Sequence, residues 1–204
     1  MPQDRLGTEP QADGQWLKQI FPVPGCSFRY GENGTCLMDR VERLTQSAEE
    51  TFEVARRLGE SLEGGEVLAL VGDLGSGKTT FTRGLVCGVG CAEYKRVNSP
   101  TYVLEQIYQG RLVVRHYDAY RLGSSSELDE LGFEEALASG AVLVVEWADR
   151  VDALMPPGKL VLELSFAGES GVGGEPGNCR RLTFSSEGTI WNTRLAALAG
   201  EQGR

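Results

Sequence analysis

The residues whose types and spacing best define a chemistry are those at positions 72–79, which read Gly-Asp-Leu-Gly-Ser-Gly-Lys-Thr. They fit the pattern Gly-x-x-x-x-Gly-Lys-[Ser/Thr] of a phosphate-binding loop, or P-loop. Glycines allow such a loop to wrap closely around a polyphosphate and to direct several backbone N–H groups towards it. In this pattern Lys78 would reach the terminal phosphates as a point charge, and the Thr79 hydroxyl would bind magnesium. The stretch therefore predicts a nucleotide-binding site.

The sequence on either side of this stretch agrees with a P-loop. The apolar run 67–71 before it is typical of a buried strand, and the segment 79–89 after it has the pattern of a helix. The N-terminus of that helix would add a dipole that favours negative charge. We expect the nucleotide to contact residues throughout the loop, namely Asp73, Leu74, Gly75, Ser76, Gly77, Lys78, Thr79 and Thr80.

A P-loop usually works with a second acidic residue that holds magnesium at the end of an apolar strand. Asp118 follows the run 112–117, and Glu146 follows the run 142–145. Glu146 is the better candidate for the metal, directly or through a water, because its strand is fully apolar and belongs in the centre of the sheet. Asp118 is then placed to orient or deprotonate the attacking water, or to sense the γ-phosphate. We expect both to act with Lys78, although each carboxylate has the plainer alternative of capping a turn.

Other polar and aromatic residues near these positions have two interpretations each. Thr101 lies in a loop of the kind that senses nucleotides in P-loop proteins, and it would approach the metal or γ-phosphate unless it serves only the turn. His116, the single histidine, is either a hydrogen-bonded core residue or a base. Trp147 packs near the nucleotide or against the sheet. Arg83 and Arg121 stabilise charge at the site or form salt bridges on the surface.

The composition indicates one domain of moderate size. The chain has 204 residues, of which 41% are hydrophobic, enough for one substantial core. No run approaches the roughly 20 apolar residues of a membrane span, and no secretory leader opens the chain. The cysteines number five and are irregularly spaced, which does not suggest a disulfide framework. We therefore expect a cytoplasmic protein with reduced thiols and no membrane partner.

The net charge limits the ways in which this chain could act on nucleic acid. It is −9, whereas a protein that grips nucleic acid by itself usually has a basic surface. Any role that involves RNA is therefore expected to be indirect, through a partner that supplies the positive surface.

The segment before the first expected element is rich in Gly, Pro, Gln and charge. We expect residues 1–40 to be a disordered extension and residues 41–204 to be the P-loop domain. A sharper hypothesis is that Met38 is the true start of the native chain. On either interpretation, ordered structure would begin just after Met38.

The remaining patterns predict an α/β domain with a P-loop NTPase-like three-layer fold. Its sheet would be mixed and mostly parallel, with antiparallel additions. A capping box at 47–50 predicts the start of a helix that ends before the glycines at 64–65. The expected strands are 66–71, 102–108, 112–118, 141–145, 160–166 and 181–184, and the other expected helices are 79–89, 127–131, 133–138 and one around 191–198.

Missing motifs favour ATP over other nucleotides and hydrolysis over transfer. The Asn-Lys-x-Asp element that reads guanine does not occur in the sequence, and neither does the Leu-Ser-Gly-Gly signature of transporter ATPases. A phosphotransferase would be expected to carry an arginine-rich lid and a substrate-binding subdomain. No clear candidate for either lies between the P-loop and Glu146.

Four motifs taken together resemble the TsaE (YjeE) family, bacterial ATPases of tRNA threonylcarbamoyladenosine biosynthesis. They are the P-loop region 72–81, Ser-Pro-Thr-Tyr at 99–102, His-Tyr-Asp-Ala-Tyr-Arg at 116–121 and Val-Glu-Trp at 145–147. The P-loop alone is shared with many NTPases, but this ordered set is far more specific. The resemblance extends from about residue 44 to residue 184.

The resemblance implies a compact P-loop fold and Mg-dependent ATP hydrolysis alongside the TsaB–TsaD pair. With TsaC-type chemistry, that pair places a threonylcarbamoyl group on the adenosine beside the anticodon. By the same resemblance, Thr79 and Glu146 hold magnesium, Asp118 is required for activity, and Thr45 lies where the first helix opens and helps to enclose the adenine. We expect the chain to cycle the complex rather than to modify tRNA itself, with slow hydrolysis in isolation. The alternatives are a small-molecule P-loop kinase and a non-hydrolysing ATP-dependent binding module.

Overall fold

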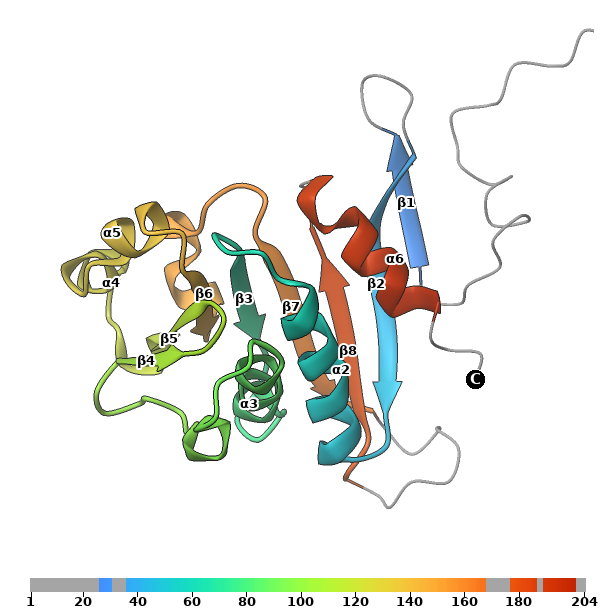
Figure 1. Cartoon of the computed structure of the whole chain (residues 1–204), viewed down its shortest axis with the longest axis horizontal. Helices are drawn as coiled ribbons and strands as arrows, with labels where there is room; N and C mark the ends of the chain where they lie inside the picture. Colours follow the sequence, from blue (N-terminus) through green and yellow to red (C-terminus); the bar gives the residue numbers. More distant parts are fainter. Residues whose placement is uncertain (1–25, 31–35, 168–176, 187–188, 201–204) are drawn as a thin grey trace, which may run out of the picture.

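Strands from both halves of the chain meet in one mixed sheet. The computed structural model describes residues 26–30, 36–167, 177–186 and 189–200, and in these residues it forms an eight-stranded sheet. The strand order is β1-β2-β8-β7-β3-β6-β5-β4 (Figure 1). The bounds are β1 Cys26–Tyr30, β2 Cys36–Thr45, β3 Val67–Val71, β4 Glu105–Gln109, β5 Val113–Asp118, β6 Val142–Glu146, β7 Leu160–Phe166 and β8 Arg180–Ser185.

The centre of the sheet is parallel and both of its sides are antiparallel. β3 pairs in parallel with β6 and β7, and β6 pairs in parallel with β5. β4 is added antiparallel to β5, while β8, β2 and β1 continue the sheet antiparallel from β7. This is the predicted class: a three-layer, P-loop-like fold with a mostly parallel core and antiparallel additions.

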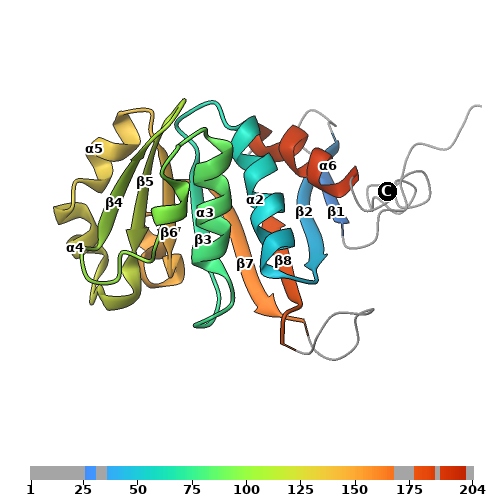
Figure 2. The ribbon, with the colours of Figure 1, turned by 60° about the horizontal axis from the view of Figure 1, so that its bottom comes forward.

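Helices cover both faces of the sheet. α2 (Ala48–Ser61), α3 (Lys78–Gly88) and α6 (Asn192–Gly200) lie side by side on one face, as the two views of the ribbon show (Figures 1 and 2). α4 (Ser125–Glu130), α5 (Phe133–Ala138) and the short 3-10 helix η3 (Ala148–Leu154) cover the other face near β6. Three further 3-10 helices are η1 (Tyr94–Arg96), η2 (Ala119–Arg121) and η4 (Thr189–Trp191).

Side chains of the central strands alternate between two hydrophobic cores, one on each face of the sheet. Leu68 and Leu70 of β3 pack with α2 and α3, whereas Val67 and Ala69 pack with the helices of the opposite face. Successive side chains of a strand point to opposite faces, so a continuous apolar run is what a strand between two helical layers requires.

The start of α2 confirms the predicted capping box. The backbone N–H of Glu50 donates to Ser47 Oγ at 3.1 Å, and the Glu50 carboxylate accepts from the backbone N–H of Gln46 at 2.8 Å. These two bonds satisfy N–H groups that a helix start leaves without partners.

The N-terminal strands differ from our expectation that ordered structure begins just after Met38. β2 begins at Cys36 and pairs along Arg40–Thr45 with β8, and β1 pairs with β2. Pairs of charged residues separate single apolar ones in this stretch, which reads Asp-Arg-Val-Glu-Arg-Leu at 39–44. Its local strand signal is therefore weak, and the strand depends on pairing with β8, which is far away in the sequence. The rest of residues 1–35 lies outside the described residues. The disordered extension and the start at Met38 therefore stay predictions.

The strand expected at 102–108 is shorter at its beginning. Residues 101–104 form a turn instead, in which the Leu104 N–H donates to Pro100 O at 2.6 Å, and β4 begins at Glu105. The Gly-rich connection between β7 and β8 falls mostly outside the described residues. Across the described ranges, no helix is long and apolar enough to cross a membrane.

Candidate nucleotide-binding site

The candidate site lies where the parallel strands β3, β6 and β5 end. The P-loop follows β3, while Glu146 and Asp118 are the last residues of β6 and β5. The register pairs Asp118 with Glu146 and Glu146 with Leu70. Ligands of open α/β sheets bind at the carboxyl ends of the strands, so the topology alone brings the predicted acids to the P-loop.

Glycine is required at two positions of the P-loop for steric reasons. Gly72 has φ 141°, and a Cβ there would lie 2.2 Å from Leu164 O on the neighbouring strand β7. Gly77, which precedes α3, has φ 109°, a conformation that side chains with a Cβ rarely adopt. The close approach to β7 and the sharp entry into α3 therefore explain the first and last fixed glycines of the motif.

Lys78 is buried within the loop and bonded to its backbone. Its Nζ donates to Gly72 O at 2.6 Å and to Asp73 O at 2.9 Å, and it lies 3.9 Å from the ring centre of Trp147. Burial lowers the pKa of Lys78, while the negative charges of Glu146 and Asp118 oppose that shift. The ammonium thus sits between two carbonyl oxygens and an aromatic face.

Thr79 and Glu146 meet as the resemblance implied. Thr79 Oγ1 donates to Glu146 Oε1 at 2.9 Å, and His116 Nε2 lies 2.9 Å from the same carboxylate oxygen. His116 is fully buried and Glu146 is 2% exposed. The hydrogen-bonded interpretation of His116 is therefore the one that the structure supports. Because a carboxylate only accepts hydrogen bonds, His116 donates through Nε2 and fixes one oxygen of Glu146.

Asp118 joins the loop 99–101 to the end of β5. Its Oδ2 accepts from Thr101 Oγ1 at 2.7 Å and from Ser99 Oγ, and its Oδ1 accepts from the backbone N–H of Tyr120 at 2.8 Å. The carboxylate is 1% exposed. It therefore caps the turn at Tyr120 and also holds the two hydroxyls of the candidate sensing loop.

A cavity of about 370 Å³ opens in front of these residues. The rings of Tyr120 and Trp147 form one wall, with their centres 5.0 Å apart. Trp147 has φ 58°, an unusual conformation for a non-glycine residue, which turns the chain sharply after Glu146. The lining residues are Leu74, Gly75, Gly77, Lys78, Thr79, Thr80, Ser99, Thr101, Tyr120, Glu146 and Trp147.

Most of the predicted site residues line this cavity, and a few do not. Asp118 lies behind it, bonded to Ser99 and Thr101. The Ser76 side chain is buried and has no hydrogen-bond partner in the described part of the chain, and Asp73 is exposed. Thr45 is not among the lining residues: it is buried at the end of β2 with its hydroxyl 2.7 Å from Thr51 Oγ1.

The two arginines considered for charge stabilisation bond elsewhere. Arg83 donates to Val97 O at 2.9 Å, and Arg121 stacks 4.3 Å from the ring centre of Tyr102. Sequence reasoning missed Ser99 and Tyr120 as individual site residues. Both stand in motifs that it quoted, each two residues from a chosen candidate.

The oxygen donors at the cavity fit magnesium. Thr79 and Glu146 supply a hydroxyl and a carboxylate, and Mg²⁺ usually takes only one or two protein ligands besides waters and phosphate oxygens. The described residues contain no group of three or more His, Cys, Asp or Glu side chains that could hold a metal by themselves. A metal at this site would therefore depend on phosphate oxygens for the rest of its ligands.

Comparisons with known proteins agree on one family. The model of the family "Threonylcarbamoyl adenosine biosynthesis protein TsaE" matches residues 45–172. The chain is 36% identical over 148 residues to the tRNA threonylcarbamoyladenosine biosynthesis protein TsaE of Rickettsia felis, covering 72% of this chain and 82% of the relative. It is 34% identical over 152 residues to the protein of the same name from Bacillus subtilis, covering 74% and 89%. The crystal structure of Bacillus subtilis YdiB superposes with a TM-score of 0.61 at 27% identity, covering 81% of this chain and 97% of that chain.

Proposed function

Because the chain belongs to the TsaE family of tRNA threonylcarbamoyladenosine biosynthesis, we propose that it is a Mg-dependent ATPase. It acts with TsaB and TsaD in forming threonylcarbamoyladenosine next to the anticodon of tRNA, and it cycles that complex rather than modifying tRNA itself. The observation that carries the ATPase proposal is the contact of 2.9 Å between Thr79 Oγ1 and Glu146 Oε1 beside the P-loop. It places the two expected metal ligands together although they are far apart in the sequence.

Each residue at the cavity has a defined part in this proposal. The backbone amides of the loop and Lys78 bind the phosphates, and Thr79 with Glu146 would hold the metal. A metal held there would supply positive charge that offsets the negative charge developing on the phosphates. His116 keeps the Glu146 carboxylate in place through its Nε2–H. Asp118 orients or deprotonates the attacking water, which requires Ser99 or Thr101 to release one of its oxygens.

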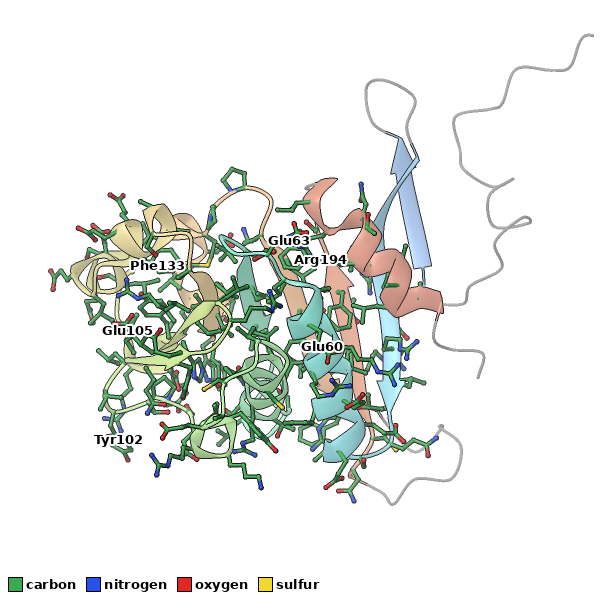
Figure 3. The ribbon with its side chains drawn as sticks, in the orientation of Figure 1. Glu60, Glu63, Tyr102, Glu105, Phe133 and Arg194 are labelled. Atoms are coloured by element: carbon green, nitrogen blue, oxygen red, sulfur yellow. The ribbon has the colours of Figure 1, made fainter. Side chains whose placement is uncertain are left out.

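The surroundings of the cavity support a partner-dependent ATPase. Among the described residues that line it, none is an arginine. Charge-stabilising groups supplied in trans can raise the rate of such reactions by roughly 10³–10⁵, so the isolated chain should hydrolyse ATP slowly. The mouth of the cavity carries apolar side chains, Leu74 at 81% exposure and Tyr120 at 47%, and Tyr102 at 83% projects from the adjoining loop (Figure 3). A protein that closes over this mouth would cover them.

The net charge and the free thiols support two further parts of the proposal, an indirect contact with tRNA and a cytoplasmic localisation. The net charge of −9 supports contact with tRNA only through the complex. Cys87, Cys91 and Cys179 are free thiols in the described part of the chain, in keeping with a cytoplasmic protein.

The test is a reconstitution with purified chain, TsaB, TsaD, threonylcarbamoyl donor and tRNA. The measured quantities are repeated modification of the tRNA and release of phosphate. Glu146→Gln keeps an acceptor for Thr79 and His116 but loses the negative charge, so we expect hydrolysis to fall by about 10²-fold or more. Glu163→Gln is the matched control, since Glu163 is an exposed carboxylate on β7, which β3 separates from β6. Normal hydrolysis by Glu146→Gln would refute the assignment of the metal ligand.

Two alternative functions have their own outcomes in this experiment. A small-molecule kinase would leave the γ-phosphate on an acceptor instead of releasing it. A non-hydrolysing binding module would sustain repeated modification with a non-hydrolysable ATP analogue. Hydrolysis that is equally fast with and without TsaB–TsaD would contradict the partner dependence.

A further inference from the structure

Arg180, the first residue of β8, reaches across a neighbouring strand to the P-loop. It pairs with Phe166 of β7 on one side and with Thr45 of β2 on the other. β7 separates β8 from β3, so the Arg180 side chain spans the end of β7 to reach the loop that follows β3. There its Nε donates to Ser76 O at 3.0 Å and its Nη2 donates to Gly75 O at 3.2 Å.

The rest of the guanidinium is also engaged. Nη1 donates to Gly177 O at 2.6 Å and to Cys179 O at 3.1 Å, and the guanidinium carbon lies 4.2 Å from the ring centre of Phe166. The planar group thus bonds to carbonyls on both sides while one of its faces rests on an aromatic ring. A lysine has a single ammonium and could not make this forked arrangement.

The two carbonyls that Arg180 holds belong to the part of the loop next to α3. A loop that directs its N–H groups towards a phosphate must turn carbonyls away from it, and those oxygens need partners of their own. Lys78 supplies partners to Gly72 O and Asp73 O, and Arg180 supplies them to Gly75 O and Ser76 O. The loop therefore has two cationic anchors, one for each half.

These anchors behave differently when a phosphate binds. Lys78 must turn from its carbonyls to reach the terminal phosphates, whereas Arg180 lies on the outer side of the loop and can keep all of its bonds. Its positive charge there also adds to the field that attracts the anion. We propose that Arg180 is a positioning residue, which holds the Gly75–Ser76 half of the P-loop in its phosphate-binding conformation. This inference rests on the nucleotide-binding part of the proposed function.

The experiment measures the Kd of Mg·ATP and of Mg·tripolyphosphate by calorimetry for the wild type, Arg180→Lys and Arg180→Gln. Both variants should bind both ligands about 10-fold more weakly, by the same factor, because the anchor acts on the amide cradle and not on base or sugar. Melting temperatures without ligand should stay close to that of the wild type. Arg181→Gln is the control: Arg181 is the next residue of β8, is 44% exposed and pairs with Glu42, so its removal should leave both Kd values unchanged.

Several results would overturn the inference. Wild-type affinity in Arg180→Lys would mean that only the charge matters, and a loss for Mg·ATP alone would mean a contact with base or sugar. A loss of affinity that follows a matching loss of melting temperature would mean a purely structural role. A wild type that binds neither ligand would refute the proposed function, and this inference with it. Normal wild-type binding with unchanged Arg180 variants would refute this inference alone.

Discussion

The side chains of the site are bonded to one another in a short buried chain of contacts. His116, Glu146 and Thr79 form one line, with both contacts to Glu146 Oε1 at 2.9 Å. The other ring nitrogen of His116, Nδ1, is buried and has no hydrogen-bond partner among the described residues. Removing the His116 or Thr79 side chain would leave the buried Glu146 carboxylate with one hydrogen bond fewer. The loss of stability would exceed the net contribution of that bond.

A prediction at this scale concerns Ser76. Its hydroxyl is fully buried and no described residue forms a hydrogen bond with it, so Ser76→Ala removes a desolvated polar group without losing a bond. We expect the free energy of unfolding to stay the same or to rise by about 1 kcal/mol. Urea unfolding measures this free energy, and Thr82→Val is the control. The buried Thr82 hydroxyl donates to Lys78 O at 3.1 Å, so its loss should destabilise the fold. A loss of 1 kcal/mol or more in Ser76→Ala would contradict the prediction.

Sequence alone predicted the residues of the site whose chemistry has a fixed pattern, and it missed those defined by tertiary contacts. The spacing of residues 72–79 placed Lys78 and Thr79, and the apolar strand before Glu146 placed the acid. Arg180 carries no such signal, because it lies 100 residues beyond the loop and its contacts arise only from the order of β3, β7 and β8. Tyr120 lines the cavity from a turn in which its backbone N–H donates to Asp118 Oδ1, a contact that residue spacing does not reveal.

At the scale of elements, α2 and α3 pack with almost no space between their backbones. Three glycines make this possible: a Cβ on Gly59 would lie 2.4 Å from Leu85 O, one on Gly84 would lie 2.2 Å from Phe52 O, and one on Gly88 would lie 2.0 Å from Arg56 O. α3 begins with Lys78 and Thr79, so the packing against α2 also fixes the direction in which the P-loop enters its helix.

Gly84→Ala tests this packing through the direction in which it changes the free energy of unfolding. At an exposed helical position the change usually stabilises by about 1 kcal/mol. Here the new methyl group would meet Phe52 O and the Ala55 side chain, so we expect a loss of about 2 kcal/mol or more in the free energy of unfolding. Denaturant unfolding measures it, and a gain in stability would show that the two helices can separate at low cost.

The exposed side of α2 carries a group whose titration should affect stability. Hydrogen bonds from Arg56 lower the pKa of Glu53 from 4.5 to about 2, with Arg57 adding to the shift. A carboxyl whose pKa is lower in the folded chain stabilises the fold above its unfolded pKa, and this contribution is lost as pH falls through the folded pKa.

We therefore expect Glu53→Gln to lower the free energy of unfolding at pH 7 by about 0.5 kcal/mol, a small effect because solvent screens these pairs. The difference from the wild type should persist down to about pH 4.5 and shrink as the pH falls towards 2. Chemical unfolding at pH 7 and pH 3 measures it, and 1 M salt is the control that should remove most of it. If the free energies of unfolding of the wild type and Glu53→Gln differed by the same amount at every pH, the titration of Glu53 would be ruled out as the cause.

The elements themselves were predicted well where their pattern is local. The capping box, the two central strands and the hairpin of β7 and β8 all formed. β2 was missed because, within its residues 40–45 whose burial is described, Val41 and Thr45 are buried but the apolar Leu44 is 53% exposed. Such a strand is held by backbone pairing with β8, which local periodicity does not reveal.

At the scale of the whole molecule, the sheet divides into a half with parallel pairing, edged by the antiparallel β4, and an antiparallel half made of β8, β2 and β1. The first half carries the candidate site and the second extends the sheet. Arg194 of α6 ties the two halves together, since it donates to the buried Glu66 beside β3 at 2.9 Å and lies 3.6 Å from Glu63 (Figure 3). The antiparallel half also contributes to the site through Arg180. Truncation of the C-terminal strand and helix should therefore affect the P-loop as well as the fold.

The overall charge leads to a prediction about tRNA. Proteins that neutralise phosphates bind nucleic acid non-specifically with Kd values of roughly 10⁻⁴–10⁻⁶ M, and the net charge of −9 opposes such binding. At physiological salt, filter binding should detect no complex of the isolated chain with tRNA below about 10 μM. The TsaB–TsaD pair serves as the positive control. Tight binding by the chain alone would contradict an indirect role.

The contacts of Lys78 have a consequence for how firmly this protein holds its ligand. Its ammonium already has two carbonyl oxygens and an indole as neighbours within the chain. A phosphate that binds Lys78 must replace these contacts with its own. Its binding free energy is therefore the difference between two similar sets of interactions. Under the proposed function, the partners that Lys78 has inside its own loop favour fast release of the product nucleotide after each turnover.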